Sequence, residues 1–419
     1  MTITAELLTI GDELLYGQVV NTNAAWMGTE LGARGVRVVQ ITSVSDDPAA
    51  IVGALDAARR RANAVLITGG LGPTKDDLTK HVLARYFASE LVLHEPTLRH
   101  VEDIFARFNR PMLDVNRAQA FVPAACDVVP NPLGTAPGMW FEAGGVVFVS
   151  MPGVPFEMKR MMTDTVLPRL TERFQPPALR HRVVQTVGLG ESFLAQTISA
   201  WEDALPAHLK LAYLPNMGQL RLRLTGLLPD GMGAGALDAE MATRIAALYP
   251  LIGEYIFAEG EIPLEEAIGQ RLIDKNLTIG TAESCTGGHV AHRLTGIAGS
   301  SAYFRGGIVA YDNQVKQLLL NVQPATLATY GAVSEETVRE MAEGARGVLG
   351  VDVALATSGV AGPGGGTPEK PVGTICIAVA DAAGTVSRRF NFDRGRSINI
   401  EYTTVQVLEM VRRRILAQG

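Results

Sequence analysis

The sequence predicts an α/β protein built from three units, and three features of the chain support this. Its 419 residues are enough for two or three domains with their own hydrophobic cores. The first third alternates short apolar runs with helical patterns, which predicts a parallel sheet covered by helices on both faces. A proline-rich break at 174–178 (FQPPA) separates this part from a middle segment of different pattern. We therefore expect units at 1–172, 173–258 and 259–419.

The composition is that of an ordinary soluble globular protein, with 47% hydrophobic and 19% charged residues. The net charge of −6 argues against non-specific nucleic-acid binding. Cys126, Cys285 and Cys376 have neither a disulfide framework nor a metal-type spacing, which indicates a reducing compartment. The acidic start of the chain does not resemble a signal peptide, and no apolar run reaches about 18 residues. We expect a cytoplasmic protein without membrane contact.

The four strands of the first unit are expected at 3–11, 36–44, 63–70 and 146–153. Three of them end in glycine, and a helical pattern runs from 49 to 61 between the second and the third. In sheets of parallel strands, ligands bind beyond the carboxyl ends of the strands. The glycine-ended strands therefore predict a ligand site at that edge.

The middle segment predicts a small α+β module. It carries a strand at HRVVQTV, a helix at 191–201, a hairpin at LKLAYLPNMGQLRLRLTG, a helix at 237–248 and a strand at EYIFA. Its GLGE sequence at 188–191 is similar to the GXXG loop of KH folds. Residues 180–259 contain six Lys or Arg and eight Asp or Glu, so RNA binding is not expected. We expect the module to serve as a linker or a dimerisation surface, and the chain to form a homodimer.

The third unit opens with a helix and continues with strand patterns. Pro263 at the helix start and Glu265 and Glu266 in its first turn suit the helix dipole. Strands are expected within LTIGTAES, GGIVAYD, VALATSGVAGP and VGTICIAVADAAGTVSRRFNF. The glycine-rich stretch at 358–367 either binds a phosphate or an oxyanion through its N–H groups or forms a flexible lid without contacts.

A glycine-rich turn in the first unit, TGGLGPTKDDLT, leads from a buried strand into a helical pattern. Glycines let the backbone approach a phosphate closely, and helix N–H groups favour anions. Asp76 and Asp77 either compensate the helix dipole or, beside a phosphate, bind Mg²⁺ or another hard cation. The preceding Thr-Gly-Gly and the IGDELLYGQVVNTN at the end of the first strand favour the cation.

Five motifs of the first unit, in order over 9–158, resemble the CinA family: TIGDELLYGQVVNTN, SVSDDP, TGGLGPTKDDLT, NPLGTAPG and PGVPFEM. The TGG element is also similar to molybdopterin-binding domains. The resemblance implies molybdopterin-type ligand binding, or hydrolysis of ADP-ribose to AMP and ribose 5-phosphate with a divalent metal such as Mg²⁺. The pocket residues it implies are Asn21, Asn23, Gly69, Gly70, Thr135 and Glu157 for the substrate and Asp12, Asp76 and Asp77 for the metal.

The third unit resembles the nicotinamide-nucleotide amidase domain of the same family over about 263–416, through GTAESCTGG, YFRGGIVAYDNQVK, GAVSEETV and SGVAGPGGGTPEKPVGTI. The resemblance implies hydrolysis of nicotinamide mononucleotide to nicotinate mononucleotide and ammonia, without a cofactor. It implies Ser284, Tyr311 and Lys316 as catalytic residues. The substrate-binding residues it implies are Glu283, Thr286, Gly287, Gly288, Gly307, Ser358, Gly362, Gly364, Arg394 and Arg396.

The adjacent Ser284 and Cys285 both qualify as nucleophiles for amide hydrolysis. Cysteine is intrinsically the better one but usually works with a histidine, and the nearby His289 and His292 belong to no motif. The family resemblance implies serine with a lysine base. Lys316 then needs a pKa below roughly 10.4, which burial or a neighbouring cation such as Arg305 would cause.

The chain departs from the family pattern near its C-terminal end. Family members carry a Gly-Asp-Arg-like turn and a further arginine about one helical turn later, whereas here Ile398 and Asn399 hold the later positions. Either Arg396, close to Arg394, substitutes for the missing arginine, or phosphate binding and amidase activity are lost. The alternative function is a non-catalytic nucleotide- or pterin-binding regulator of competence or DNA-damage responses.

Overall fold

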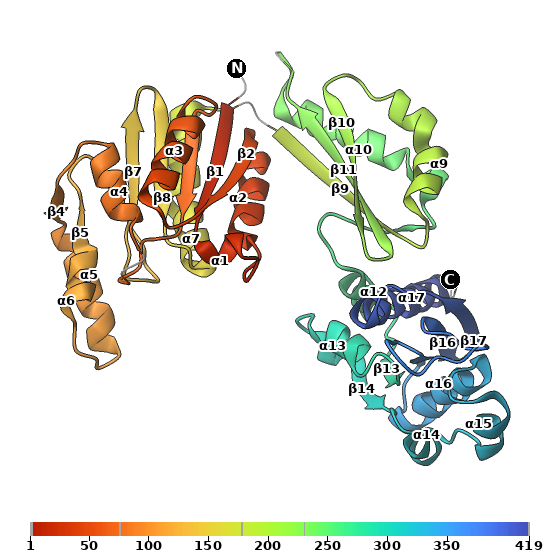
Figure 1. Ribbon diagram of the computed structural model, residues 1–419. Coiled ribbons are helices and arrows are strands. Elements are labelled where there is room, and N and C mark those ends of the chain that lie inside the picture. The colour runs from red at the N-terminus through yellow and green to blue at the C-terminus, as the bar shows by residue number, and fades with distance from the viewer. Residues whose placement is uncertain (1–2, 75–76, 177–178, 230, 418–419) are drawn as a thin grey trace. The chain divides into compact units, whose positions relative to one another are not determined.

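The computed structural model describes residues 3–74, 77–176, 179–229 and 231–417, which form two compact units (Figure 1). The first contains the chain up to residue 180 and the segment 227–234, and the second contains 181–226 and 235 onward. Each is an α/β or α+β arrangement, so the expected fold class is confirmed. None of the helices in the described ranges combines the length and the apolar composition that crossing a membrane requires.

The first unit is built on a six-stranded sheet with the strand order β2-β1-β3-β8-β7-β6. The four expected strands are its parallel members: β1 (Ile3–Ile10), β2 (Val36–Val44), β3 (Ala64–Thr68) and β8 (Val146–Met151). Two antiparallel strands, which the sequence did not reveal, extend one edge: β7 (Gly138–Ala143) and β6 (Asp127–Val129).

Helices cover both faces of this sheet because successive strand residues point to opposite sides. One face packs against α2 (Thr22–Ala33), α7 (Pro155–Met161) and α8 (Leu167–Phe174). The other packs against α3 (Pro48–Arg59) and α4 (Thr79–Tyr86). An extension at the outer edge in Figure 1 holds β4 (Leu91–Leu93), α5 (Glu95–Arg107), α6 (Asp114–Arg117) and β5 (Phe121–Pro123).

The second unit begins with a four-stranded sheet in the order β10-β11-β9-β12. The strands are β9 (Leu179–Val187), β10 (Leu209–Asn216), β11 (Gln219–Leu227) and β12 (Ile256–Glu259), and β10 and β11 form the predicted hairpin. Its helices are α9 (Glu191–Asp203), α10 (Ala234–Ala246) and α11 (Tyr249–Ile252). Val187 and Phe257 pack into the core of the following domain, which joins the two parts.

The C-terminal domain is a five-stranded sheet in the order β14-β13-β15-β16-β17. The parallel strands are β13 (Ile279–Glu283), β14 (Phe304–Val309) and β15 (Val353–Gly359); β16 (Thr374–Asp381) and β17 (Gly384–Asn391) run antiparallel. One face carries α12 (Leu264–Asp274), α13 (His289–Thr295) and α17 (Arg396–Ala417). The other carries α14 (Asn313–Leu320), α15 (Pro324–Tyr330) and α16 (Glu335–Leu349). The three parallel strands end at one edge, where the GTAESCTGG turn lies.

Candidate functional site

The turn after β13 joins this buried strand to α13 and lies at the carboxyl edge of the sheet. The Ser284 N–H donates to the Thr357 carbonyl oxygen at 2.9 Å, which continues the pairing of β13 with β15 by one residue. Gly287 and Gly288 then take left-handed φ values of 61° and 96°, a region that favours glycine, and α13 begins. The sharp reversal leaves Ser284 at the carboxyl end of the sheet with 9% of its surface exposed.

Glu283 holds this turn in shape. The side chain is fully buried, and its carboxylate accepts hydrogen bonds from the N–H groups of Gly288 (3.0 Å), Val290 (3.0 Å) and Ala291 (2.8 Å). It also accepts one from the Thr286 hydroxyl at 2.7 Å. These contacts use both carboxylate oxygens and cap the start of α13. Glu283 and Thr286, which we expected to bind substrate, therefore position the turn at 284–288. This turn carries the candidate nucleophile Ser284 and is called the nucleophile turn.

Cys285 lies next to Ser284 but is poorly suited to attack. The residue is 6% exposed, and burial raises the pKa of its thiol to about 12. A neutral thiol is a weak nucleophile because the thiolate is the reactive form. His289, the nearest histidine in the sequence, has its Nε2 2.7 Å from the Glu401 carboxylate and is not hydrogen-bonded to the Cys285 thiol. The geometry favours serine over cysteine.

Lys316 has the surroundings that a lysine base needs. Its side chain, on α14, is 1% exposed, and Nζ donates to the carbonyl oxygens of Ala310 (2.9 Å) and Tyr311 (3.1 Å). Ala310 in turn donates its N–H to the Glu283 carbonyl oxygen at 2.8 Å, which ties this segment to the nucleophile turn. Burial lowers the pKa of Lys316 from its usual value, against the opposing effects of Asp312 and Cys285; Arg305, which we expected to contribute, is not among the causes.

Two hydrogen bonds to carbonyl oxygens are compatible with both protonation states of Lys316, since the ammonium has three N–H donors and the neutral amine has two. In the neutral form, which burial favours, the lone pair is left to accept a proton. The Ser284 hydroxyl is not hydrogen-bonded to Lys316 here, and such catalytic contacts often tighten only when substrate binds.

Arg396 connects two other predicted residues. From the start of α17 its guanidinium donates to the Gly362 carbonyl oxygen at 3.1 Å and to the Tyr311 hydroxyl at 3.3 Å. Arg396 of α17 thus contacts both the glycine-rich loop and the segment that follows β14. Arg394 is exposed in the turn just before the helix. The structure therefore gives Arg396 a place within the candidate site.

Asn399, which the sequence marked only as a departure from the family's arginine, has a structural role at this site. It is 1% exposed; its amide nitrogen donates to the Ala361 carbonyl oxygen at 3.0 Å, and its side-chain oxygen accepts the Arg394 N–H at 2.9 Å. Asn399 thus fixes the glycine-rich loop to α17. Its only sequence signal is a polar side chain on a helix face that is otherwise buried.

Some of the remaining residues predicted to bind substrate pack within the protein, and others lie in an open loop. The Ser358 hydroxyl is buried and donates to the Ala332 carbonyl oxygen at 2.7 Å, so it serves the neighbouring loop. A Cβ on Gly307 would lie 2.4 Å from the Thr281 hydroxyl, which makes Gly307 a packing residue. Gly364 has open space around it in the glycine-rich loop. The structure brings Ser284, Lys316, Tyr311, Arg396 and Gly362 to one edge of the sheet and leaves the others in supporting positions.

The first unit has its own cavity of about 470 Å³, at the carboxyl ends of β1, β3 and β8, where the sequence predicted a ligand site. Predicted residues that line it are Asn21, Asn23, Gly69, Gly70, Asp77, Thr135 and Glu157. The sequence did not single out six further polar residues that line it: Thr9, Glu13, Thr22, Asp46, Thr68 and Gln119.

The glycines of this cavity bring the backbone close to it. Gly69 (φ 105°) has no room for a Cβ, which would lie 2.1 Å from the Ile10 carbonyl oxygen. Asn21 caps α2 through the Ala24 N–H at 3.0 Å, and the amide nitrogen of Asn23 donates to the Gly153 carbonyl oxygen at 2.6 Å. The buried side-chain oxygen of Asn23 has no hydrogen-bond partner among the described residues. An unsatisfied buried acceptor at a cavity wall indicates a ligand or an ion that completes it.

The acidic residues of the cavity differ from those expected. Asp12 does not line it, and its N–H donates to the Asp46 carboxylate at 3.1 Å, whereas the next residue, Glu13, does line it. One Asp77 oxygen accepts the Thr74 N–H at 2.9 Å and the Thr74 hydroxyl. Asp76 lies outside the described residues.

No three His, Cys, Asp or Glu side chains in the described part of the chain form a metal-binding cluster. The carboxylates of Glu13, Asp46, Asp77 and Glu157 nonetheless line the same cavity. Mg²⁺ is commonly bound by one or two carboxylates together with substrate phosphates and waters. This donor set fits a cation that binds together with a phosphate-bearing substrate.

Comparison with known proteins assigns each of the three parts of the chain to a family. Residues 6–172 match the family described as probable molybdopterin binding domain, 181–258 the damage-inducible protein CinA KH domain, and 261–415 the CinA C-terminal domain. A CinA-like protein of Cytophaga hutchinsonii is 46% identical over 413 residues, which cover 99% of this chain and 98% of the relative. The chain belongs to the CinA family.

Other CinA relatives extend the match. A CinA-like protein of Salinibacter ruber is 42% identical over 410 residues, covering 98% of each chain. The crystal structure of a competence/damage-inducible protein from Agrobacterium tumefaciens is 40% identical and covers 37% of this chain and 98% of its own, with a TM-score of 0.34.

Proposed function

We propose that the C-terminal domain hydrolyses the carboxamide of nicotinamide mononucleotide to nicotinate mononucleotide and ammonia. The observation that carries this is Lys316, buried beside the nucleophile turn with its two amine donors bound by backbone carbonyls. Membership of the CinA family supports the same assignment. No cofactor is needed, because serine and lysine supply the nucleophile and the base.

In the proposed reaction the Ser284 hydroxyl attacks the carboxamide carbon and its proton passes to Lys316. The tetrahedral intermediate collapses when Lys316 returns this proton to the departing nitrogen. Ammonia departs, and the acyl group remains bound to Ser284 as an ester. Water then hydrolyses the ester, again with Lys316 as base, and restores the serine. In this proposal the substrate phosphate binds to Arg396, which contacts the glycine-rich loop at the Gly362 carbonyl oxygen, and to N–H groups of that loop.

For the N-terminal domain we propose hydrolysis of ADP-ribose to AMP and ribose 5-phosphate with a divalent metal such as Mg²⁺. A bound cation would neutralise the pyrophosphate and activate water. The support is a glycine-walled cavity that carries four carboxylates and an unsatisfied Asn23 oxygen. The whole chain would then recycle two breakdown products of pyridine nucleotides, as a homodimer in the cytoplasm.

A second candidate is a non-catalytic regulator that binds a nucleotide or a pterin. The match of residues 6–172 to a molybdopterin-binding domain and the replacement of the second family arginine by Asn399 favour it. Incubation of the purified protein with nicotinamide mononucleotide separates the two. Steady release of ammonia supports the amidase, whereas folded protein that binds the nucleotide without releasing ammonia supports the regulator.

A further inference from the structure

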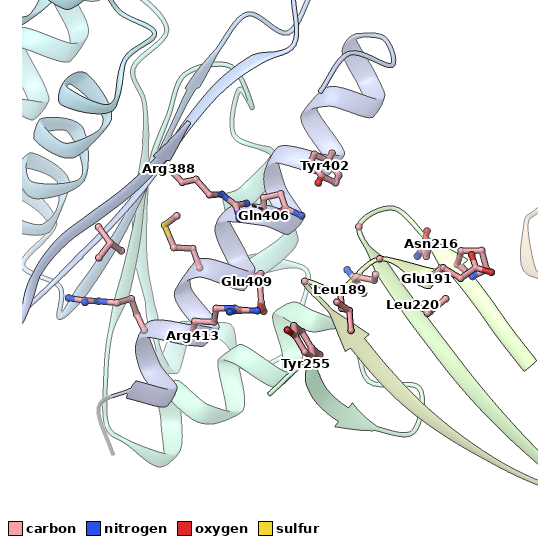
Figure 2. Close-up of a pocket in the computed structure, with 18 residues that line it drawn as sticks. Leu189, Glu191, Asn216, Leu220, Tyr255, Arg388, Tyr402, Gln406, Glu409 and Arg413 are labelled. Atoms are coloured by element: carbon pink, nitrogen blue, oxygen red, sulfur yellow. Dashed lines mark hydrogen bonds and ion pairs between the residues drawn. The ribbon is translucent and has the colours of Figure 1, made fainter. Parts of the chain in front are cut away.

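The second unit contains a cavity of about 880 Å³ that belongs to neither candidate site (Figure 2). One wall is the GLGE loop before α9 and the tip of the β10–β11 hairpin. The opposite wall is α17, with Arg388 of β17 beside it. Ligand cavities in proteins have volumes of about 300–1,000 Å³, so a small molecule fits here.

The two walls are held in place relative to each other by close contacts. A Cβ on Gly188 would lie 3.1 Å from the side chains of Arg413 and Glu409, and one on Gly218 would lie 3.1 Å from Val405. Behind the cavity, the buried Arg412 of α17 donates to the Glu254 carbonyl oxygen at 2.6 Å. The cavity is therefore formed before any ligand arrives.

Arg388 supplies a positive charge that the protein does not neutralise. Its guanidinium donates to the side-chain oxygen of Gln406, and no carboxylate among the described residues pairs with it. The other two arginines at the cavity have carboxylate partners: Arg413 pairs with Glu409 at 2.7 Å, which also pairs with the buried Arg412, and with Glu254 at 4.0 Å. Arg414 pairs with Asp381 at 2.8 Å. The excess charge at the cavity is thus concentrated at Arg388.

Gln406 adds an unused donor next to this charge. The residue is 8% exposed, and its side-chain oxygen is taken by Arg388. The amide nitrogen makes no hydrogen bond to any residue in the described ranges, and Figure 2 shows it on the side away from Arg388. This nitrogen is not one of the buried unpaired atoms of the described residues, so it reaches the open space of the cavity and can donate to a ligand there. A free donor and an uncompensated guanidinium together select an anion.

The rest of the cavity suits an organic body rather than a bare anion. Tyr255, Tyr402 and Met410 line it with ring and thioether surface. Gly190 precedes α9 without a side-chain cap, and Gly190 and Glu191 line the cavity at the start of this helix. Two carboxylates also line the cavity, and of these Glu409 is neutralised by Arg412 and Arg413, while Glu191 is exposed at the rim.

We propose that this cavity binds a mononucleotide, with its phosphate at Arg388 and Gln406 and its base among the aromatic residues. A nucleic-acid strand is the weaker choice because the GLGE loop faces α17 across a cavity of single-nucleotide size. The site lies on the same helix that begins with Arg396 at the candidate active site. It is a third nucleotide site of the chain, separate from both proposed catalytic ones.

The test is calorimetric titration of the full-length protein with AMP, which measures both affinity and the number of sites. Gln406→Glu places a carboxylate where the phosphate would bind and can still pair with Arg388, so the fold is kept. We expect this variant and Arg388→Gln to lose one AMP per chain or to bind it at least about tenfold more weakly. Arg389→Gln is the matched control, because the adjacent Arg389 donates instead to the Glu369 carbonyl oxygen.

Three results would overturn the proposal. The first is wild-type protein and both variants binding AMP with the same affinity and stoichiometry. The second is inorganic phosphate binding at this site as tightly as AMP, which would leave no part for the nucleoside. The third is tighter binding of a single-stranded RNA oligonucleotide than of AMP by the wild-type protein, with this RNA binding lost in the same two variants. An unchanged Tm of each variant shows that its loss of binding does not come from a loss of structure.

Discussion

The two candidate sites lie at equivalent places in two α/β domains, yet they are built differently. In the C-terminal domain the Glu283 carboxylate, the Lys316 amine and the Asn399 amide are buried and bound by backbone groups. In the N-terminal domain the acidic side chains come from separate segments around the cavity: Glu13 lies on a short helix, Glu157 on α7, and Asp46 and Asp77 in loops. The first site is therefore assembled in advance, whereas in the proposed function the second would be completed by a cation and a substrate.

This difference follows from the groups that each proposed reaction uses. A lysine base works at neutral pH only when burial lowers its pKa, so the protein must enclose it. Carboxylates that bind a hard cation must stay ionised and accessible to water and phosphate. Enclosure and openness are therefore the expected signatures of a metal-free and a metal-dependent hydrolase, and each can be tested separately.

The largest expected effect comes from removing the nucleophile. Ser284→Ala should lower ammonia release from nicotinamide mononucleotide by at least about 10³-fold, because the proposed ester forms on the Ser284 hydroxyl. Cys285→Ala should keep most of the activity, since burial holds the thiol pKa at about 12. Ammonia assays on both variants decide the assignment, and the reverse pattern would make Cys285 the nucleophile.

The next effect concerns Lys316 and pH. Attack requires the neutral amine, and burial lowers the pKa of Lys316. The value of kcat/KM should therefore rise as pH increases through this lowered pKa and then level off. Lys316→Ala should lose this rise and about 10²–10⁴-fold in rate.

Lys316→Arg provides the control for charge. Arginine does not deprotonate in proteins, so it cannot act as a base, although it can still bind a phosphate. We expect the arginine variant to be as inactive as the alanine variant. A near-normal kcat with a raised KM would instead show that Lys316 only binds substrate.

The sequence was sufficient for the fold class and for the strand that leads into the nucleophile turn, because both leave periodic apolar patterns. It did not reveal β6, with three residues, or the extension at 91–123, whose strands are equally short. Strands of this length carry too few residues to show alternation. Their pairing depends on neighbours that are distant in the chain.

Side-chain roles were harder to predict because they depend on direction. Asp12 and Glu13 are adjacent on the short helix α1 (Asp12–Leu15), where successive side chains point about 100° apart, so only one lines the cavity. Glu283 belongs to a family motif, but its partners are amides of the following helix and become visible only when the turn is folded. A motif identifies where a site lies more reliably than what each member does.

A smaller effect, confined to one domain, is expected at Asp77. Asp77→Asn keeps an oxygen that can accept from Thr74 but removes the charge that a cation requires. We expect ADP-ribose hydrolysis to fall by roughly 10–100-fold, with an unchanged Tm and unchanged ammonia release. EDTA should likewise silence only the ADP-ribose reaction. If Asp77→Asn is fully active and only Asp77→Ala is impaired, Asp77 is a turn cap and not a metal ligand.

The smallest effect is expected at Tyr311, and it tests how far the C-terminal site is assembled in advance. Its carbonyl oxygen holds Lys316, while its hydroxyl contacts Arg396 at 3.3 Å on a side chain that is 62% exposed. Tyr311→Phe keeps the carbonyl and removes one exposed hydrogen bond, worth about 1 kcal/mol or less. We therefore expect KM to rise about two- to fivefold, with kcat and its pH dependence unchanged, because Arg396 loses a support but Lys316 does not. Arg396→Ala should raise KM further by the same route. A loss of about 100-fold or more in kcat for Tyr311→Phe would instead place the phenol hydroxyl at the reacting atoms, as the family resemblance implies, and would mean that this site closes on its substrate.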